Sequence, residues 1–513
     1  MLVSDIIEYG ARKHPDRLAL RFEDQTVTYG QFRDRIRSLA NALLKVGSRG
    51  DRVAILSTNC PEYFDCYYGI PMAAMALTII NFRLHPDQLV DLIEHSGPSV
   101  LIVSREFSPV VDGIRDRLST VHEIVVIDGD DPATSWSSFV GSASSDLPAA
   151  RPDADDMAWL VYTSGTTGIP KGVMLSHRNL VAGVTSSAVQ WHVPEDTVFL
   201  NCFPLCHVGG YVNMIFHLLG QTVGFIRAYD NATFLLLVGE WQVTQTGLAP
   251  TMINFLLKDP QLDSYDLSSL QAVGYGSSAI PAAVLREGLE RLGCDFYQGM
   301  GMTETGGNVL HFDEPSHRRA ANGETHLLAA AGKPMRLADV RIVDDELRDL
   351  PTGETGEMLV RADQVMTGYW RDPQATVETF ADGWLRTGDL ARQDEEGFIY
   401  IVDRRKDMII SGGENVASLA VEQALYRQPA VAEAAAVGIP DDTWGEIVCA
   451  VVVRRPDAPG NDDQVAAEII AGCRQHLAGY QVPRRVEFVS ELPKNVTGKI
   501  LKKDLRKRFA QLV

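Results

Sequence analysis

Short apolar runs alternate with segments of helical spacing along roughly the first four fifths of the chain. The runs that we interpret as buried strands are residues 53–57, 100–104, 123–127 and 158–162. Residues 31–46 instead carry apolar side chains at helical spacing. Because this alternation continues to about residue 400, it predicts an α/β fold in which helices cover layered sheets.

The longest apolar stretch, residues 66–80, contains Gly69 and Pro71. It is shorter than the ~20 residues that a membrane span requires. We therefore interpret it as a buried helix and expect no integral membrane segment. The N-terminal sequence MLVSDIIEYGARKHPDR has acidic residues inside its apolar run, which is not typical of a signal peptide. Residues 128–156 are rich in Ser, Asp, Ala and Pro, and we predict a surface excursion there.

The character of the chain changes near residue 403. The charged sequence DRRKD lies between strand-like runs, and about a hundred residues with their own short strands follow it. That length is enough for a small α/β domain. We predict an N-terminal domain of layered α/β sheets, 1–403, and a small C-terminal α/β domain, 404–513, with the boundary at 404–407. The strand-like runs in and before the second domain are 398–402, 408–410, 434–439, 449–453 and 486–489.

Composition limits the classes of partner. The chain has 513 residues, of which 45% are hydrophobic and 22% are charged, as is typical of globular proteins. Its formal net charge of −20 argues against a nucleic-acid partner, because phosphate backbones require clustered Lys and Arg. A single nucleotide needs only a local positive site, so the charge does not exclude one.

The seven cysteines show no spacing typical of a disulfide framework. We expect reduced thiols in a cytoplasmic protein. Cys202, Cys206 and His207 lie close together in the sequence, but ordinary buried thiols are favoured over a metal site because no second ligand pair is near.

The segment TSGTTGIPKG, residues 163–172, follows a predicted strand and carries the clearest chemical signal. Its glycines allow backbone N–H groups to approach an anion, and its hydroxyls and the Lys171 ammonium add donors. A nucleotide phosphate chain fits these donors. A P-loop NTPase requires Gly-Lys-Ser/Thr at the end of the loop, whereas Pro170 precedes Lys171 here and Gly172 follows it. A Ser/Gly linker without function is the remaining alternative.

Further motifs along the chain resemble those of one family. They are VTYGQF at 27–32, YQGMGMTET at 297–305, GWLRTGDL at 383–390, DRRKDMIISGGENV at 403–416 and LPKNVTGKILK at 492–502. With the loop at 163–172, they resemble in order the motifs of the adenylate-forming superfamily of acyl-CoA synthetases, luciferases and peptide-synthetase adenylation domains. The resemblance covers nearly the whole chain, and VGIPDDTWGE at 437–446 resembles the medium- and long-chain fatty acyl-CoA synthetases.

The resemblance implies activation of a carboxylic acid with ATP and Mg²⁺, which yields an acyl-adenylate. A carboxylate such as Glu304 suits Mg²⁺, and the resemblance adds Thr163 as a second metal ligand. Thr303 is expected to bond the α-phosphate, while Asp389 takes the ribose hydroxyls and Arg404 touches ribose or phosphate. The remaining residues expected around the phosphates and the adenine are Ser164, Gly165, Thr166, Thr167, Gly168, Lys171, Gly276, Ser277, Ser278, Ala279, Tyr297, Gln298, Gly299 and Met300.

Lys499 matches the lysine that bridges the carboxylate and the α-phosphate in the family, and a solvated lysine at a helix start is the alternative. For the second step, the resemblance implies that a mobile C-terminal domain swings about Lys406 so that the thiol of coenzyme A reaches the adenylate. Gly412 and Gly413 match the loop that lines the pantetheine tunnel. The sequence departs from the family at 417–420, where Ala-Ser-Leu-Ala replaces a Tyr/Pro-type pair and a Glu, and at 74–79.

His207 matches the position that gates the acid pocket, although a structural histidine is the alternative. We expect the pocket to be lined by small and adaptable residues, since glycines leave room and Met adapts. The candidates are Val208, Gly209, Gly210, Thr251, Gly274, Gly276, Met300, Gly301 and Gly307. None of them is acidic, which favours a bulky or long apolar acid over an amino acid.

Three functional hypotheses stay open at this point. The first is an acyl-CoA synthetase, and the second is an adenylating enzyme that loads an acyl carrier protein. The third is a nucleotide-binding protein without turnover, because fold does not guarantee activity. A second copy of the chain, in a homodimer, is a further partner compatible with the sequence.

Overall fold

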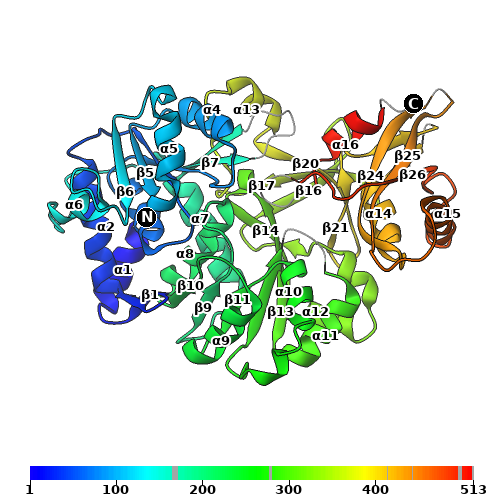
Figure 1. Ribbon diagram of the computed structural model, residues 1–513, viewed down its shortest axis with the longest axis horizontal. Coiled ribbons are helices and arrows are strands. Elements are labelled where there is room, and N and C mark those ends of the chain that lie inside the picture. Colours follow the sequence, from blue (N-terminus) through cyan, green and yellow to red (C-terminus); the bar gives the residue numbers. More distant parts are fainter. Residues whose placement is uncertain (164–170, 277–279, 413, 442, 495–499, 511–513) are drawn as a thin grey trace. The chain divides into compact units, whose positions relative to one another are not determined.

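The computed structural model describes residues 1–163, 171–276, 280–412, 414–441, 443–494 and 500–510. Within these residues, the chain divides into two compact units (Figure 1). Unit 1 comprises Met1–Val340 and Val360–Leu385, and unit 2 comprises Arg341–Leu359 and Arg386–Val513. The division falls inside three strands, namely β16 (Asp339–Val343), β17 (Gly356–Arg361) and β20 (Trp384–Gln393).

The first sheet of unit 1 is mostly parallel, with antiparallel strands at both edges. Its order is β15 (Lys333–Pro334), β14 (Gly307–Phe312), β13 (Asp295–Met302), β12 (Ala272–Gly276), β11 (Gln245–Gly247), β9 (Val198–Asn201), β10 (Thr222–Phe225), β1 (Leu18–Phe22) and β2 (Gln25–Thr28).

The second sheet of unit 1 has parallel strands at its centre and two antiparallel strands at one edge. Its order is β18 (Gly368–Tyr369), β8 (Lys171–Ser176), β7 (Met157–Thr163), β4 (Ala76–Ile79), β3 (Arg52–Leu56), β5 (Val100–Ser104) and β6 (Glu123–Ile127).

Helices cover and separate these two sheets. Figure 1 shows α10, α11 and α12 gathered beside β13. The helices of unit 1 are α1 (Asp5–Lys13), α2 (Tyr29–Leu43), α3 (Pro61–Met72), α4 (Pro86–Ser96), α5 (Ser108–Ile114), α6 (Trp136–Gly141), α7 (His177–Gln190), α8 (Tyr211–Leu218), α9 (Asn231–Trp241), α10 (Pro250–Leu257), α11 (Ala282–Leu292), α12 (Glu314–Ala321) and α13 (Pro373–Thr379). Short 3-10 turns lie at Arg105–Phe107, Arg115–Arg117, Val208–Gly210, Leu262–Ser264, Thr303–Thr305 and Thr325–Ala329.

The main core of unit 1 joins both sheets. Apolar side chains of α2, α3, α7 and α8 pack in one buried cluster with residues of both sheets, such as Phe199 and Trp159. The opposite face of the second sheet packs against α4 and α5 through Leu56 and Val103. Because strands with both faces covered need apolar residues at successive positions, their sequences are continuous apolar runs rather than alternating ones.

The strand β21 (Ile399–Arg404) of unit 2 pairs with β20, in a sheet that also holds β16, β17 and, from unit 1, β19 (Phe380–Ala381). A second sheet has the order β23 (Glu414–Val416), β22 (Ile409–Ser411), β25 (Gly445–Arg454) and β24 (Val431–Asp441), with β26 (Arg485–Phe488) on β25.

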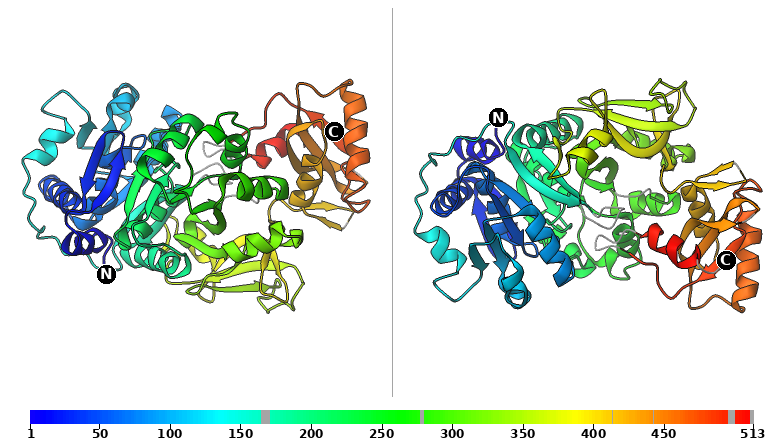
Figure 2. Two further views of the ribbon diagram at one scale, coloured as in Figure 1. Left: turned by 90° about the horizontal axis from the view of Figure 1, so that it is seen from below. Right: turned by 90° about the horizontal axis from the view of Figure 1, so that it is seen from above.

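Side chains of β24 alternate between two cores, as the period of a strand requires. Ala434 and Ala436 face α14 (Ser418–Tyr426) and α15 (Asp462–Cys473). Ala435 and Val437 face α16 (Lys502–Phe509). Figures 1 and 2 show α15 and α16 on opposite sides of this sheet.

The predicted α/β fold is confirmed, but the apolar stretch 66–80 is not one buried helix. The helix α3 ends at Met72, and the rest of the stretch forms β4, which pairs in parallel with β3 and β7. Pro71 lies in the last turn of α3, and Ala74 has a positive φ of 58° that reverses the chain. A strand buried on both faces has no alternation to distinguish it from a helix.

The predicted boundary at 404–407 lies between the last residue of β21 and the first of β22, and therefore between the two sheets of unit 2. The compact units themselves divide earlier in the chain. The hinge at this boundary stays a prediction.

Candidate functional site

The phosphate-loop candidate begins and ends on adjacent strands of unit 1. Thr163 is the last residue of β7 and pairs directly with Lys171, the first residue of β8. The Thr163 hydroxyl donates to the Lys171 carbonyl at 3.5 Å. Ligands of open α/β sheets bind at the carboxyl ends of parallel strands, and β7 ends there. The loop residues Ser164, Gly165, Thr166, Thr167 and Gly168 lie outside the described residues.

Lys171 and Glu304 contact the same tyrosine. The ammonium of Lys171 lies 4.7 Å from the centre of the Tyr369 ring, and the Tyr369 hydroxyl donates to Glu304 Oε1 at 2.9 Å. The structure thus brings together a predicted phosphate donor and a predicted metal ligand. Sequence reasoning missed Tyr369, because a Gly-Tyr pair on a short edge strand carries no chemical signal of its own.

A tightly bonded turn positions Glu304. Thr303 begins the 3-10 turn Thr303–Thr305, and the Thr305 hydroxyl donates to the Gly307 carbonyl at 2.6 Å. Gly306 ends the turn with a φ of 58°. The Glu304 carbonyl accepts from the Met366 N–H at 2.9 Å. The carboxylate is consequently fixed and 8% exposed, while Thr303 is half-buried.

The donor set around Glu304 fits a Mg²⁺ ion held jointly with a nucleotide. Within the described part of the chain, no group of three or more His, Cys, Asp or Glu side chains could hold a metal ion. Mg²⁺ is commonly bound by one or two carboxylates together with substrate phosphates, so the single buried carboxylate of Glu304 suits it. Thr163, the second predicted ligand, has its hydroxyl directed at the Lys171 carbonyl.

Two adjacent strands hold the adenine candidates. Gly276 pairs with Gly299, and Gly274 pairs with Tyr297. The Tyr297 side chain is 5% exposed, and its ring centre lies 5.2 Å from that of Trp191, so Tyr297 belongs to the core of unit 1.

Because successive side chains of a strand alternate in direction, Gln298 and Met300 lie on the other face of β13 from Tyr297. Gln298 is buried and Met300 is half-buried. Contact of Tyr297, Gln298, Gly299 and Met300 with adenine stays a prediction. Ser277, Ser278 and Ala279 lie outside the described residues.

The glycines assigned to the acid pocket differ in the space beside them. A Cβ at Gly209 would meet nothing within 4 Å. At the other five glycines this space is filled. A tyrosine ring fills it beside Gly210 (Tyr67), Gly274 (Tyr297) and Gly307 (Tyr211), and a backbone carbonyl fills it beside Gly276 (Gly299) and Gly301 (Gly307). The expectation that these glycines leave room holds for Gly209, whereas the others allow a tyrosine or a neighbouring strand to approach closely.

His207 precedes the short turn Val208–Gly210, and its carbonyl accepts from the Gly210 N–H at 3.0 Å. The pKa of His207 is lowered from 6.5 to about 4. Burial is the larger cause, and the positive charge of Arg83 is the smaller one. The imidazole is therefore neutral at pH 7. Thr251 is exposed in the first turn of α10, and Val208 is half-buried.

In unit 2, Asp389 of β20 and Arg404 of β21 are directly opposite across the sheet. Arg404 Nε lies 2.5 Å from Asp389 Oδ1, and the Asp389 side chain is 2% exposed. The Asp389 N–H donates to the Thr387 hydroxyl at 3.1 Å, and that hydroxyl donates to the Met358 carbonyl at 2.7 Å. The two residues expected at the ribose are thus brought together by strand pairing.

The candidates for the thiol step follow β21. Lys406 is exposed in the turn closed by the Asp407 N–H and the Arg404 carbonyl at 2.8 Å. Gly412 has a φ of 61°, and its N–H donates to the Trp444 carbonyl at 2.8 Å. A Cβ at Gly412 would stand 2.6 Å from the Trp444 ring, so glycine is required there. Gly413 lies outside the described residues.

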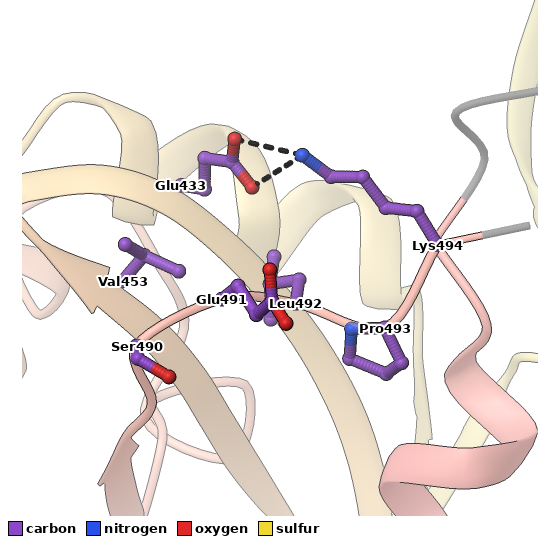
Figure 3. A pocket seen from close by; sticks show the side chains of 7 residues that line it. All are labelled: Glu433, Val453, Ser490, Glu491, Leu492, Pro493 and Lys494. Carbon is purple, nitrogen blue, oxygen red and sulfur yellow. Dashed lines mark hydrogen bonds and ion pairs between the residues drawn. The ribbon is translucent and has the colours of Figure 1, made fainter.

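Lys499 also lies outside the described residues, but both flanks of its segment are placed. Lys494 and Ile500 form an antiparallel bridge, and Lys494 Nζ lies 2.7 Å from a carboxylate oxygen of Glu433. Figure 3 shows this ion pair at the edge of an open cavity of about 500 Å³, which residues 490–493 and Val453 also line. Lys494, which precedes that segment, is thereby joined to β24.

A polar network that sequence reasoning missed begins at α16, which follows that segment in the sequence. Lys502, the first residue of α16, donates to the Ser418 hydroxyl at 2.6 Å and lies 2.8 Å from Glu422 Oε1. Ser418 in turn donates to the buried carboxylate of Asp403. Further along α16, Arg506 NH2 lies 2.9 Å from Asp407 Oδ1. The charged sequence DRRKD was the available signal, although Asp403 meets Ser418 from 15 positions away and Asp407 meets Arg506 from 99.

The cysteines are free and buried, as expected of reduced thiols. Burial raises the pKa of Cys202 to about 12 and that of Cys206 to about 11. Both thiols are therefore protonated at pH 7, as ordinary buried thiols are. Among the helices that the structure describes, none is long and apolar enough to cross a membrane.

Comparison with known proteins gives matches over nearly the whole chain. The family model of AMP-binding enzymes matches residues 7–370, and that of the AMP-binding enzyme C-terminal domain matches residues 420–499. A feruloyl-CoA synthase of Amycolatopsis sp is 38% identical over 505 residues, which are 97% of each chain.

Two further proteins are similar along their length. The fatty acid–[acyl-carrier-protein] ligase ScoC of Streptomyces coeruleorubidus is 33% identical over 98% of this chain and 95% of its own. The crystal structure of the anthranilate CoA ligase AuaEII in complex with anthranoyl-AMP superimposes with a TM-score of 0.89 at 27% identity, covering 100% of this chain and 98% of that one.

Proposed function

Because this chain belongs to the family of AMP-binding enzymes, we propose that it joins a bulky or long apolar carboxylic acid to coenzyme A through an acyl-adenylate. The family members that form acyl-CoA use ATP, Mg²⁺ and coenzyme A. One observation carries the proposal for this chain: the cluster of Lys171, Tyr369 and Glu304 beside the strand end from which the phosphate loop departs.

In the proposed first step, a carboxylate oxygen of the acid attacks the α-phosphorus of ATP. The new bond is between carboxylate oxygen and phosphorus, and the bond to the bridging oxygen of pyrophosphate breaks. The step brings two anions together, so it requires positive charge and held geometry. Lys171 supplies charge at the leaving pyrophosphate, and Thr303 donates a hydrogen bond to the α-phosphate.

Glu304 would hold Mg²⁺, which neutralises phosphate charge when it is bound together with ATP. The buried position of Glu304 keeps its carboxylate aimed at one place. Asp389 binds the ribose hydroxyls, and Arg404 orients Asp389 through their ion pair. Lys499 provides the cation between the acid carboxylate and the α-phosphate.

In the proposed second step, the thiol sulfur of coenzyme A attacks the acyl carbon, the thiol proton passes to solvent, and AMP leaves. Lys406 is the pivot about which the C-terminal domain moves to admit the thiol. The close contact between Gly412 and Trp444 supports a shaped backbone wall at the thiol channel.

The apolar acid is supported by the residues assigned to its pocket. They include Val208, Met300 and five glycines against tyrosine rings or backbone, and none of them is acidic. The neutral state of His207 removes a charge that would otherwise favour a second carboxylate. By their names, one relative described above forms feruloyl-CoA and the other acts on a fatty acid, and both acyl groups are largely apolar.

A second candidate is the loading of an acyl carrier protein. It is favoured by the similarity to the ligase ScoC, whose name specifies that acceptor. Both acceptors present a pantetheine thiol, so the same adenylate serves either.

One assay series tests the proposal. ATP–pyrophosphate exchange is measured over a panel of aromatic and aliphatic acids, and thioester formation is then measured with coenzyme A and with a pantetheinylated carrier protein. We expect exchange with at least one apolar acid and thioester with coenzyme A. Thioester with the carrier protein alone would establish the second candidate. Nucleotide binding without exchange for any acid would contradict both and favour a binding protein.

A further inference from the structure

We infer that Tyr369 is a positioning residue of the adenylation step, which holds the carboxylate of Glu304 with its hydroxyl and the ammonium of Lys171 with its ring. This inference rests on the proposed function. No motif in the sequence assigned a role to Tyr369, and its role follows from the contacts of one side chain with two others.

The contact with Glu304 is a hydrogen bond to a largely buried carboxylate. The Tyr369 hydroxyl donates to Oε1 at 2.9 Å. Hydrogen bonds to ionised groups are about twice as strong as neutral ones, and little water competes for an 8% exposed side chain. The bond occupies one carboxylate oxygen. Within the described residues, Oε2 has no donor, so this oxygen stays available to a cation.

The contact with Lys171 is a cation over an aromatic face. The Nζ atom lies 4.7 Å from the ring centre, inside the roughly 6 Å over which a ring attracts a cation. Lys171 itself is half-buried at the start of β8. The ring therefore restrains an otherwise flexible side chain without supplying it with a counter-ion.

The ring also separates two opposite charges. Between Lys171 and Glu304, both within the described residues, there is no ion pair within 4.0 Å. A direct pair would neutralise both groups and remove them from a nucleotide and its cation. Because Tyr369 contacts each of them, it keeps the ammonium available to phosphate and the carboxylate available to Mg²⁺.

The backbone around Tyr369 is fixed on three sides. Tyr369 pairs with Val173 of β8, and its N–H donates to the Thr376 hydroxyl at 2.8 Å. The next residue, Trp370, donates its N–H to the Gly172 carbonyl at 2.7 Å and its indole N–H to the His95 carbonyl at 3.1 Å. A side chain held in this way can preorganise the two groups that it contacts.

Two substitutions separate the two contacts. Tyr369→Phe removes the hydroxyl and keeps the ring face for Lys171. Tyr369→Leu removes both contacts and lets the two charges approach each other. The matched control is Tyr400→Phe, because the Tyr400 hydroxyl also donates to a carboxylate, Asp394, at 2.9 Å, while its ring carries the Arg392 guanidinium at 4.3 Å.

The measurement is calorimetric binding of α,β-methylene-ATP as a function of Mg²⁺ concentration, which needs no turnover. For Tyr369→Phe we expect about a tenfold increase in the Mg²⁺ concentration that gives half of the maximal effect on nucleotide binding. The nucleotide affinity at saturating Mg²⁺ should be unchanged. For Tyr369→Leu we expect the same change together with about tenfold weaker binding at saturating Mg²⁺. Tyr400→Phe should match the wild type in both quantities.

ATP–pyrophosphate exchange adds a second readout, in which Tyr369→Phe should raise the KM for Mg²⁺–ATP more than it lowers kcat. Binding curves of Tyr369→Phe that coincide with the wild type would overturn the inference while leaving the proposed function intact. Equal weakening by Tyr369→Phe and Tyr369→Leu would overturn the role of the ring. Absence of Mg²⁺-dependent nucleotide binding by the wild type would instead defeat the proposed function, and this inference with it.

Discussion

The backbone N–H and the hydroxyl of Ser418 both donate to the carboxylate of Asp403, at 2.5 Å and 3.0 Å. Asp403 is 4% exposed, and its carboxylate also accepts from the Arg404 N–H at 2.7 Å. The bonds join the end of β21 to the first turn of α14, across the segment predicted to be the hinge. Ser418 lies in the segment 417–420, which departs from the motif expected by resemblance to the family.

Substitution of Ser418 should loosen this connection in two stages. Ser418→Ala removes the hydroxyl donor and the acceptor of Lys502, and Ser418→Pro also removes the N–H. Proline is tolerated at the first position of a helix, so the second change tests the hydrogen bond and not the helix. We expect the free energy of local opening to fall by about 1–3 kcal/mol for each hydrogen-bond donor that the carboxylate loses. The readout is hydrogen exchange of peptides covering 414–426, with exposed Ser490→Ala as control. Equal protection in all three variants would contradict the prediction.

Lys499→Ala should abolish most of the first step and spare the second. The lysine charge is needed where two anions meet and not when the adenylate is already formed. We expect roughly a 10²- to 10³-fold loss in ATP–pyrophosphate exchange, with nearly unchanged thioester formation from a supplied acyl-adenylate. Lys503→Ala, an exposed lysine of α16, is the control. Comparable losses in both steps would refute the assignment.

Gly412→Ala should impair the second step more than the first. Its φ of 61° is unfavourable for alanine, and the new Cβ would stand 2.6 Å from the Trp444 ring. The backbone next to the predicted thiol channel must therefore shift. Gly397→Ala is a matched control, since Gly397 has a φ of 86° but its Cβ would meet nothing closer than 3.8 Å. We expect at least a roughly tenfold fall in the rate of thioester formation relative to pyrophosphate exchange, a cost of about 1.4 kcal/mol in the barrier. If both substitutions had a similar effect, backbone strain alone would explain the fall in the rate of thioester formation.

His217 should make the protein sensitive to acid. Burial lowers its pKa from 6.5 to about 3, while Tyr68 contacts Nδ1 at 2.8 Å. As the pH falls below 6.5, the unfolded chain binds a proton that the folded chain does not, so the free energy of unfolding decreases. The loss from this side chain is about 1.4 kcal/mol per pH unit until the folded pKa is reached.

The measurement for His217 is urea unfolding of the wild type and of His217→Gln between pH 7 and 4.5. The glutamine variant cannot titrate, so its unfolding free energy should decline less steeply with falling pH. Parallel pH profiles would show that His217 does not contribute. Other buried histidines with lowered pKa values, such as His177 and His311, act in the same direction in both proteins.

Much of the fold could be predicted from local pattern. The strands at 100–104 and 123–127 were located to the residue, because each is a short apolar run between polar flanks. The stretch 66–80 was misinterpreted, because α3 and β4 are both buried on all sides and share one continuous apolar sequence. Only the pairing of β4 with its neighbours distinguishes them, and such pairing is not a local property.

The candidate site, like the fold, could be predicted only in part from the sequence. Glu304, Lys171 and Asp389 stand in motifs, and strand pairing brings Asp389 to Arg404. Tyr369 could not be predicted, because it meets Glu304 from 65 positions away and Lys171 from 198. The expectation of free space beside the pocket glycines was wrong in most cases, because the tyrosines that fill this space come from other helices and strands.

The course of the chain between its compact units has a consequence for synthesis. The chain leaves unit 1 after Val340, returns at Val360 and leaves again after Leu385. The strands β16 and β17 therefore emerge from the ribosome before β20, with which they share a sheet. Because β20 ends at Gln393, beyond the last residue of unit 1, we expect the sheet of β16, β17 and β20 to form only after all of unit 1 has been translated.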